Sequence, residues 1–214
     1  MLFYGHYQIY PFKSIKVDSF IVLDNFNQFI ELIQKHGLEN TQVDLVLSCV
    51  DNYAARITIN SACCKVNQPW MESGVSEDAF SGHIQLMLPG RTACFQCVPP
   101  YAIASGMDES TIKRGGVCTA SLPTTMGIIA GFLVQNTLKF LLQFGQVSYY
   151  LGYSALNNCF TNDIYLPCKD CCNDDCKRLQ IQYSEKWSPS TWKPPITNVS
   201  EEDNIWGITY PLYS

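Results

Sequence analysis

The chain has 214 residues, of which 47% are apolar and only 15% charged, with a formal net charge of −5. This composition is sufficient for one large α/β domain, and the acidic balance without a basic cluster argues against nucleic acid and anionic membranes as partners. The 11 cysteines are an odd number, gather at metal-like spacings and follow no signal peptide. We therefore expect a reducing, cytoplasmic environment.

The first part of the chain predicts a short strand followed by a helix. Residues 8–16 have the character of one short strand. Residues 22–36 carry apolar side chains at helical spacing. Asp24 or Asn25 is expected to cap this helix at its amino end, and Gly37 to end it.

The middle of the chain alternates strand and helix in the manner of an α/β fold. Residues 43–50 form an apolar run that predicts a buried parallel strand, and residues 53–66 have the pattern of the helix that follows it. Two more strands are expected at residues 69–75 and 82–88. The sequence thus predicts a Rossmann-like sheet with helices packed against it.

A long apolar segment at residues 126–142 requires a test for membrane insertion. Gln135, Asn136 and Lys139 interrupt it, whereas a spanning helix needs about 20 apolar residues. We therefore expect a buried core helix that begins at Pro123, and no membrane span. Later strands are expected at residues 147–153 and 163–166.

The end of the chain differs in composition from the rest. Residues 186–200 are rich in Pro, Ser and Thr, which is typical of a linker. We therefore place one domain at residues 1–184 and a flexible tail at 185–214. In the tail, Trp206 and Ile208 follow an acidic run, as in short motifs that add a strand to a partner's sheet. A disordered end is the alternative interpretation.

Two groups of cysteines far apart in the sequence have the spacing of zinc ligands. Cys94 and Cys97 form the first pair. Such a pair directs two sulfurs at one ion, and two pairs complete a tetrahedral site. Buried thiols that pack as small apolar groups are the alternative. The second pair is ambiguous, since it has four candidates: Cys168, Cys171, Cys172 and Cys176.

Cys118 belongs to neither group and lies just before the apolar helix. Gly115 and Gly116 predict a mobile loop before it, while Lys113 and Arg114 favour its thiolate. The amino end of the following helix also lowers a thiol pKa. A reactive nucleophile is therefore our interpretation of this cysteine, with a buried structural thiol as the alternative.

Asp51 and Asn52 directly follow the predicted strand at residues 43–50. In open α/β sheets, ligands bind at the carboxyl ends of the strands. These two residues are therefore candidates for binding magnesium and nucleotide. Both types also favour an ordinary turn at the end of a strand.

Several segments spread over nearly the whole chain match the motifs of one known family. They are Val43-Asp-Leu-Val-Leu-Ser-Cys-Val-Asp-Asn52, Trp70-Met-Glu-Ser-Gly-Val-Ser76, Ser81-Gly-His-Ile-Gln85, Gly116-Val-Cys118 and Ser121-Leu-Pro-Thr-Thr-Met-Gly127. Leu151-Gly-Tyr153 and, in the tail, Trp206-Gly-Ile208 agree with them. On these segments the chain resembles the family of enzymes that activate the ubiquitin-fold modifier, within the ThiF type of adenylation domains.

The resemblance implies a homodimeric α/β enzyme that uses ATP and magnesium to adenylate the terminal Gly of the modifier. Cys118 would then capture the modifier as a thioester, and Asp51 and Asn52 would hold magnesium and nucleotide. His83 would contact the modifier, and Trp206 with Ile208 would bind it through the tail. The family's second pair has four intervening residues, so the implied structural zinc ligands are Cys94, Cys97, Cys171 and Cys176.

The chain departs from the family pattern in three places. No G-x-G-x-x-G precedes Asp51, and the segment by which the family recruits its conjugating enzyme is absent. Tyr210 and Pro211 stand where the tail motif has an aliphatic pair. We therefore expect an amino-terminally truncated activating enzyme with an incomplete adenylation domain. The alternatives are a non-catalytic form that binds the modifier or dimerises with an intact subunit, and a zinc-stabilised scaffold.

Overall fold

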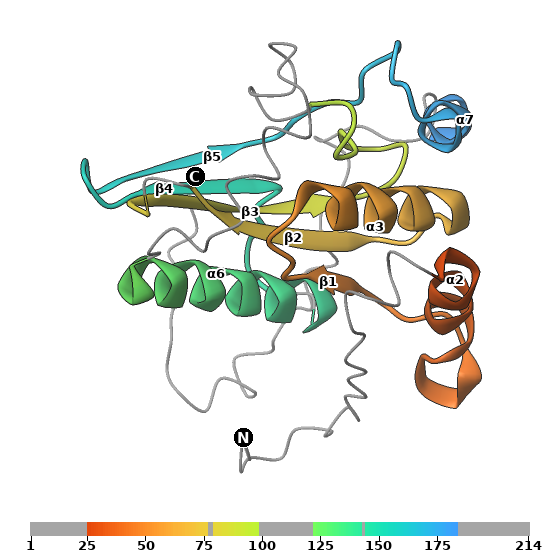
Figure 1. Cartoon of the computed structure of the whole chain (residues 1–214), viewed down its shortest axis with the longest axis horizontal. Helices are drawn as coiled ribbons and strands as arrows, with labels where there is room; N and C mark the ends of the chain where they lie inside the picture. Colours follow the sequence, from red (N-terminus) through yellow and green to blue (C-terminus); the bar gives the residue numbers. More distant parts are fainter. Residues whose placement is uncertain (1–24, 77–78, 99–121, 143, 184–214) are drawn as a thin grey trace, which may run out of the picture.

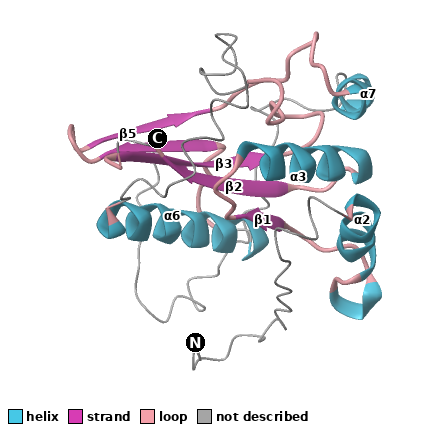
Figure 2. Ribbon diagram, in the orientation of Figure 1, coloured by secondary structure: helices cyan, strands magenta, loops and turns pink. Residues whose placement is uncertain are grey.

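The computed structural model describes residues 25–76, 79–98, 122–142 and 144–183, and these form one mixed sheet with helices against both faces (Figures 1 and 2). The sheet has the strand order β1-β2-β3-β4-β5. Its strands are β1 (Val46–Ser48), β2 (Trp70–Val75), β3 (Ser81–Met87), β4 (Tyr150–Ser154) and β5 (Cys159–Asp163). The helices are α2 (Phe26–Lys35), α3 (Tyr53–Val66), α6 (Pro123–Leu142) and α7 (Asp174–Tyr183), with a 3₁₀ turn η1 (Leu38–Asn40).

The sheet changes direction after its second strand. β1 and β2 run parallel, with Val46 opposite Trp70. The neighbours β2 and β3, β3 and β4, and β4 and β5 are all antiparallel. The parallel pair is joined through α3, as expected for a crossover, because parallel strands cannot be connected by a tight turn.

Alternation along β2 divides the core into two layers. Trp70 is fully buried among residues of α2 and α3, whereas the next residue, Met71, is fully buried against α6. Successive side chains of a strand point to opposite faces. Helices α2 and α3 therefore cover one face of the sheet and α6 covers the other (Figure 1).

The sequence located most of these elements. The predicted helix at residues 53–66 is confirmed with the same bounds, and α2 lies within the predicted helix at 22–36. Asn25 is the residue before α2, but its side chain makes no capping hydrogen bond. The strands at 69–75, 82–88 and 147–153 are confirmed to within three residues at each end.

Two strand predictions need correction. The strand expected at 43–50 contains only three paired residues, and Leu47 in its centre is 44% exposed, so it is not buried throughout. The last strand is not at 163–166 but at Cys159–Asp163, where all five residues are exposed. A strand with both faces exposed carries no alternation of apolar and polar residues, which is the pattern that sequence reading relies on.

Helix α6 begins at Pro123, as predicted, but only one of its faces is buried. Ile129 and Leu133 pack against the sheet, while Met126 and Val134 are at least half exposed. By length and composition alone, α6 would be able to cross a membrane. Its packing against β2 and β3 is that of a helix on a sheet, and an apolar helix of this kind is only weak evidence for a span.

Candidate functional site

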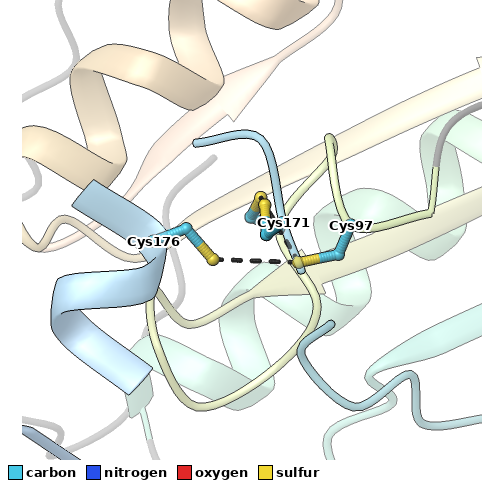
Figure 3. A group of neighbouring side chains, drawn as sticks. Cys97, Cys171 and Cys176 are labelled. Atoms are coloured by element: carbon cyan, nitrogen blue, oxygen red, sulfur yellow. Dashed lines mark hydrogen bonds between the residues drawn. The ribbon is translucent and has the colours of Figure 1, made fainter. Parts of the chain in front are cut away.

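The structure brings together the thiols of four cysteines that are far apart in the sequence. Cys94 and Cys97 lie in the turn after β3, Cys171 lies in the loop before α7, and Cys176 lies in the first turn of α7. Figure 3 shows the side chains of Cys97, Cys171 and Cys176 pointing toward one another. All four sulfurs lie within 4.8 Å of one another. Cys94, Cys171 and Cys176 are at most 3% exposed, and Cys97 is partly exposed.

The spacing of these sulfurs fits a tetrahedral zinc ion. The Sγ atoms of Cys94 and Cys97 are 3.6 Å apart. Cys94 is 3.7 Å from Cys171, and Cys97 is 3.7 Å from Cys176. Four thiolates at a Zn–S distance of about 2.3 Å would lie about 3.8 Å apart. The group therefore has the dimensions, the donor atoms and the burial of a metal centre with four cysteine ligands.

A backbone hydrogen bond and the side chain of Asn173 fix the positions of these cysteines. The Cys97 N–H donates to the Cys94 carbonyl at 2.9 Å and closes the first turn. The Asn173 side chain accepts from the Cys176 N–H at 2.9 Å at the amino end of α7, and its amide donates to Gln96 Oε1 at 2.8 Å. Asn173 thus joins the two cysteine-bearing segments directly.

Several N–H groups point at sulfurs of the cluster, as expected around thiolates. The Asn173 backbone N–H donates to Cys171 Sγ at 3.4 Å, and Gln180 Nε2 donates to Cys176 Sγ at 3.4 Å. Asn60 Nδ2 on α3 donates to Cys94 Sγ at 3.7 Å. Such outer contacts orient ligands and favour their charged form.

The cysteines are not electrostatically equivalent. Hydrogen bonds from the thiols of Cys64, Cys94 and Cys97 lower the pKa of Cys176. The hydrogen bond to Cys176 raises the pKa of Cys97 to about 12, and the same contact raises the pKa of Cys94. Four thiolates at this spacing would repel one another unless a divalent cation lay between them.

The other two candidates for the second pair lie outside the cluster. Cys168 and Cys172 are both exposed. Cys172 Sγ accepts only a long contact of 3.6 Å from Gln96 among the described residues. Sequence reading missed Cys64, whose buried sulfur on α3 packs against the cluster.

Asp51 and Asn52 lie where β1 ends and α3 begins. Asp51 is exposed. Asn52 is the cap of α3, because its Oδ1 accepts from the Ala55 N–H at 2.8 Å. Its Nδ2 lies 3.5 Å from Asp51 Oδ1. The Asp51 carboxylate is thus exposed at the carboxyl end of a strand, where it is accessible to a cation.

His83 lies on β3 and lines a cavity of about 330 Å³ between β3, β4 and β5. Its Nε2 is hydrogen-bonded to Oε1 of Glu72, which is fully buried in β2. The other carboxylate oxygen of Glu72 lies 3.4 Å from Nε of Arg56 on α3. The imidazole stacks on Tyr150, with ring centroids 5.4 Å apart. The sequence predicted His83 as a site residue but not Glu72 and Arg56. The one signal in the sequence was Glu72 itself, an acidic residue inside an apolar strand.

Three predicted site residues lie outside the described residues. They are the nucleophile candidate Cys118 and the tail residues Trp206 and Ile208. Their roles stay predictions, as does the division of the chain at residue 184.

The structure combines a sheet in which a parallel pair is continued by antiparallel strands, an exposed acid after β1 and a cluster of four cysteines. The ThiF family model matches residues 9–176, and the chain belongs to the ThiF family. The solved structure of E. coli MccB has a similar fold, with a TM-score of 0.51 and 18% identity over 70% of this chain and 43% of MccB.

The sequence is much closer to ubiquitin-like modifier-activating enzyme 5 of several organisms. It is 52% identical to the Caenorhabditis elegans protein over 205 residues, covering 92% of this chain and 49% of that protein. It is 60% identical to the Dictyostelium discoideum protein over 198 residues, covering 87% and 52%. The Mus musculus protein is 53% identical over 87% of this chain and 47% of its own length. The chain thus spans about half the length of the relatives it matches.

Proposed function

We propose that this chain acts in an activating enzyme for the ubiquitin-fold modifier, in which its Cys118 receives the modifier while an intact second subunit carries out the adenylation. The observation that carries the proposal is its 52% to 60% identity to ubiquitin-like modifier-activating enzyme 5 along nearly its whole length. An exposed carboxylate at the end of β1 and a cavity lined by His83 agree with this activity. We place the chain in a reducing, cytoplasmic environment, in keeping with the free thiols of its ten described cysteines.

The proposed reaction has two steps, for which ATP supplies the activating group and magnesium screens its phosphates. The carboxylate of the modifier's terminal Gly attacks the α-phosphorus of ATP, and pyrophosphate leaves. The Cys118 thiolate then attacks the acyl carbon, a thioester forms, and AMP leaves with the bonding electrons. In this reaction Asp51 would hold magnesium, and His83 would contact the modifier.

We also propose that Cys94, Cys97, Cys171 and Cys176 hold a structural zinc ion. Their sulfur spacing, burial and N–H contacts support this assignment. Zinc in a closed site of four thiolates supplies folding energy and takes no part in the reaction. Its role here would be to join the turn after β3 to the start of α7.

The proposed partners are the modifier, a conjugating enzyme and a second copy of the enzyme. Trp206 and Ile208 would add the tail as a strand to a ubiquitin-like partner. The runner-up function is a non-catalytic chain that binds the modifier or pairs with an intact subunit. The two functions differ in whether a modifier thioester forms on Cys118 in the presence of an intact subunit.

The deciding experiment measures two reactions of the purified 214-residue chain. We expect no modifier-dependent exchange of pyrophosphate into ATP by the chain alone, because no G-x-G-x-x-G precedes Asp51 to hold the triphosphate. We expect a modifier thioester on Cys118 when an intact subunit lacking its own nucleophilic cysteine is added. A Cys118→Ser chain is the matched control, since it would give an ester that resists thiols. If no adduct forms in the mixture, the proposed function is rejected in favour of the non-catalytic function.

A further inference from the structure

The buried carboxylate of Glu72 lies between His83, which lines the cavity, and Arg56, which contacts the segment before Asp51. Glu72 is 0% exposed in the middle of β2. A buried charge is costly unless it is paired, so its partners indicate what it does. One carboxylate oxygen is hydrogen-bonded to His83 Nε2 on β3, and the other lies 3.4 Å from Arg56 Nε on α3.

Arg56 links the Glu72 carboxylate to the end of the segment that precedes Asp51. One of its terminal nitrogens donates to the Val50 carbonyl at 3.0 Å and to the Ser73 carbonyl at 3.2 Å. Val50 directly precedes Asp51, the candidate magnesium ligand. Glu72 thus orients a guanidinium that holds the end of β1.

His83 carries the connection to the cavity. Its ring lies between the Glu72 carboxylate and the face of Tyr150, and both residues of that stack line the cavity. Gly74 leaves room for this arrangement, since a Cβ there would lie 3.0 Å from His83 Cε1 and 3.3 Å from the Arg56 guanidinium.

We propose that Glu72 is a positioning residue, which fixes the orientation and tautomer of His83 while holding Arg56 against the end of β1. This inference rests on the proposed role of His83 in binding the modifier. A carboxylate only accepts hydrogen bonds, so the neutral imidazole bonded to it carries its proton on Nε2 and leaves Nδ1 as an acceptor. Glu72 therefore determines which ring nitrogen offers a lone pair to a ligand.

The test replaces Glu72 by Gln, which has one acceptor oxygen and one NH₂ group. The positively charged Arg56 attracts the amide oxygen, so the NH₂ group faces His83 Nε2. The ring must then accept at Nε2 and carry its proton on Nδ1. We expect nitrogen NMR of the ¹⁵N-histidine-labelled chain, well above the ordinary imidazole pKa of about 6.5, to show the Nε2–H tautomer in the wild type and Nδ1–H in E72Q.

The chain has only 3 histidines, so His83→Gln assigns the signals. Glu31→Gln is the matched control, because Glu31 is an exposed acid paired with Lys35. It should leave the tautomer unchanged. An Nδ1–H tautomer in the wild-type chain would overturn the proposal, and this measurement needs no variant that might fail to fold.

Binding of the ubiquitin-fold modifier gives the second readout. We expect E72Q to weaken binding roughly tenfold, the usual cost of a misdirected buried polar contact. In the His83→Gln background it should change binding by less than about twofold, because interacting positions are not additive. An equal loss in both backgrounds would show a general effect on folding and refute the positioning role. A tautomer change in a chain that binds no modifier would uphold the positioning role and reject the proposed function.

Discussion

Asn136 of α6 and Ser148 form a reciprocal pair of hydrogen bonds in the core. Asn136 Nδ2 donates to the Ser148 carbonyl at 2.9 Å, and its Oδ1 accepts from the Ser148 N–H at 2.9 Å. Asn136 is only 4% exposed. Asn136, one of the polar residues that interrupt this apolar helix, thus satisfies backbone groups of the segment that leads into β4.

This pair predicts the effect of making α6 more apolar. Asn136→Leu should lower the free energy of unfolding by about 2 kcal/mol, because it leaves the Ser148 backbone groups without partners. Gln135→Leu on the exposed side is the matched control and should change it by less than about 0.5 kcal/mol. Urea denaturation of both variants measures the difference. Equal stability of the two would contradict the assignment.

The cap of α3 gives a second prediction. Asn52→Ala removes the acceptor of the Ala55 N–H and should cost about 1 kcal/mol of stability. Asn52→Ser keeps a good capping oxygen, adds no charge beside Asp51, and should stay within about 0.5 kcal/mol of the wild type. Thermal unfolding at matched protein concentration compares the two variants. Destabilisation by Ser as large as that by Ala would contradict the capping role.

The metal centre gives a third prediction, which separates two adjacent cysteines. Cys171→Ala should abolish stoichiometric zinc, because the Cys171 sulfur is buried within the cluster. Cys172→Ala should retain zinc, since that side chain is exposed outside it. Elemental analysis after gel filtration counts the ions. Zinc kept by Cys171→Ala and lost by Cys172→Ala would reverse the ligand assignment.

A fourth prediction concerns the contact between α3 and the metal centre. Asn60 is fully buried, donates to Cys94 Sγ and accepts from the Phe95 N–H at 2.9 Å. Asn60→Asp replaces the donor with a like charge beside a thiolate, so zinc affinity should fall about 10-fold to 100-fold. Competition with a coloured chelator measures the loss, with Ser61→Ala as control. Unchanged affinity would show that Asn60 supports only the turn.

The fifth prediction concerns thiol reactivity in the zinc-loaded chain. Burial raises the pKa of the Cys63 thiol, so this residue should not react with iodoacetamide at neutral pH while the chain is folded. Cys118 should react first if it is the nucleophile. Mass spectrometry after brief labelling ranks the sites. The exposed thiols that compete with Cys118 are Cys49, Cys159, Cys168 and Cys172. Faster labelling of any of these four would count against Cys118 as the nucleophile.

The sequence predicted the features that depend on local pattern. Helix α3 follows from its position after an apolar strand, and Cys94 and Cys97 were identifiable by their spacing. The choice of Cys171 over Cys172 needed the family resemblance, since both are compatible with a metal pair. The role of Glu72 was not predictable, because it depends on the register that places β2 beside β3 and on the reach of Arg56 from α3. Long-range side-chain pairing leaves no periodic signal in the sequence.

The cysteine cluster has a consequence for how the chain can be divided. Cys94 and Cys171, 77 residues apart, belong to the same group of sulfurs. A backbone cut between Val98 and Leu122 would give each piece two of the four sulfurs, together with one strand of the β3–β4 pair. A bound ion would then be shared by two separate polypeptides. We expect such pieces, expressed separately, to reassemble in the presence of zinc and to dissociate more readily when a chelator is added. The structural ion would then be a reversible link between two halves of one domain.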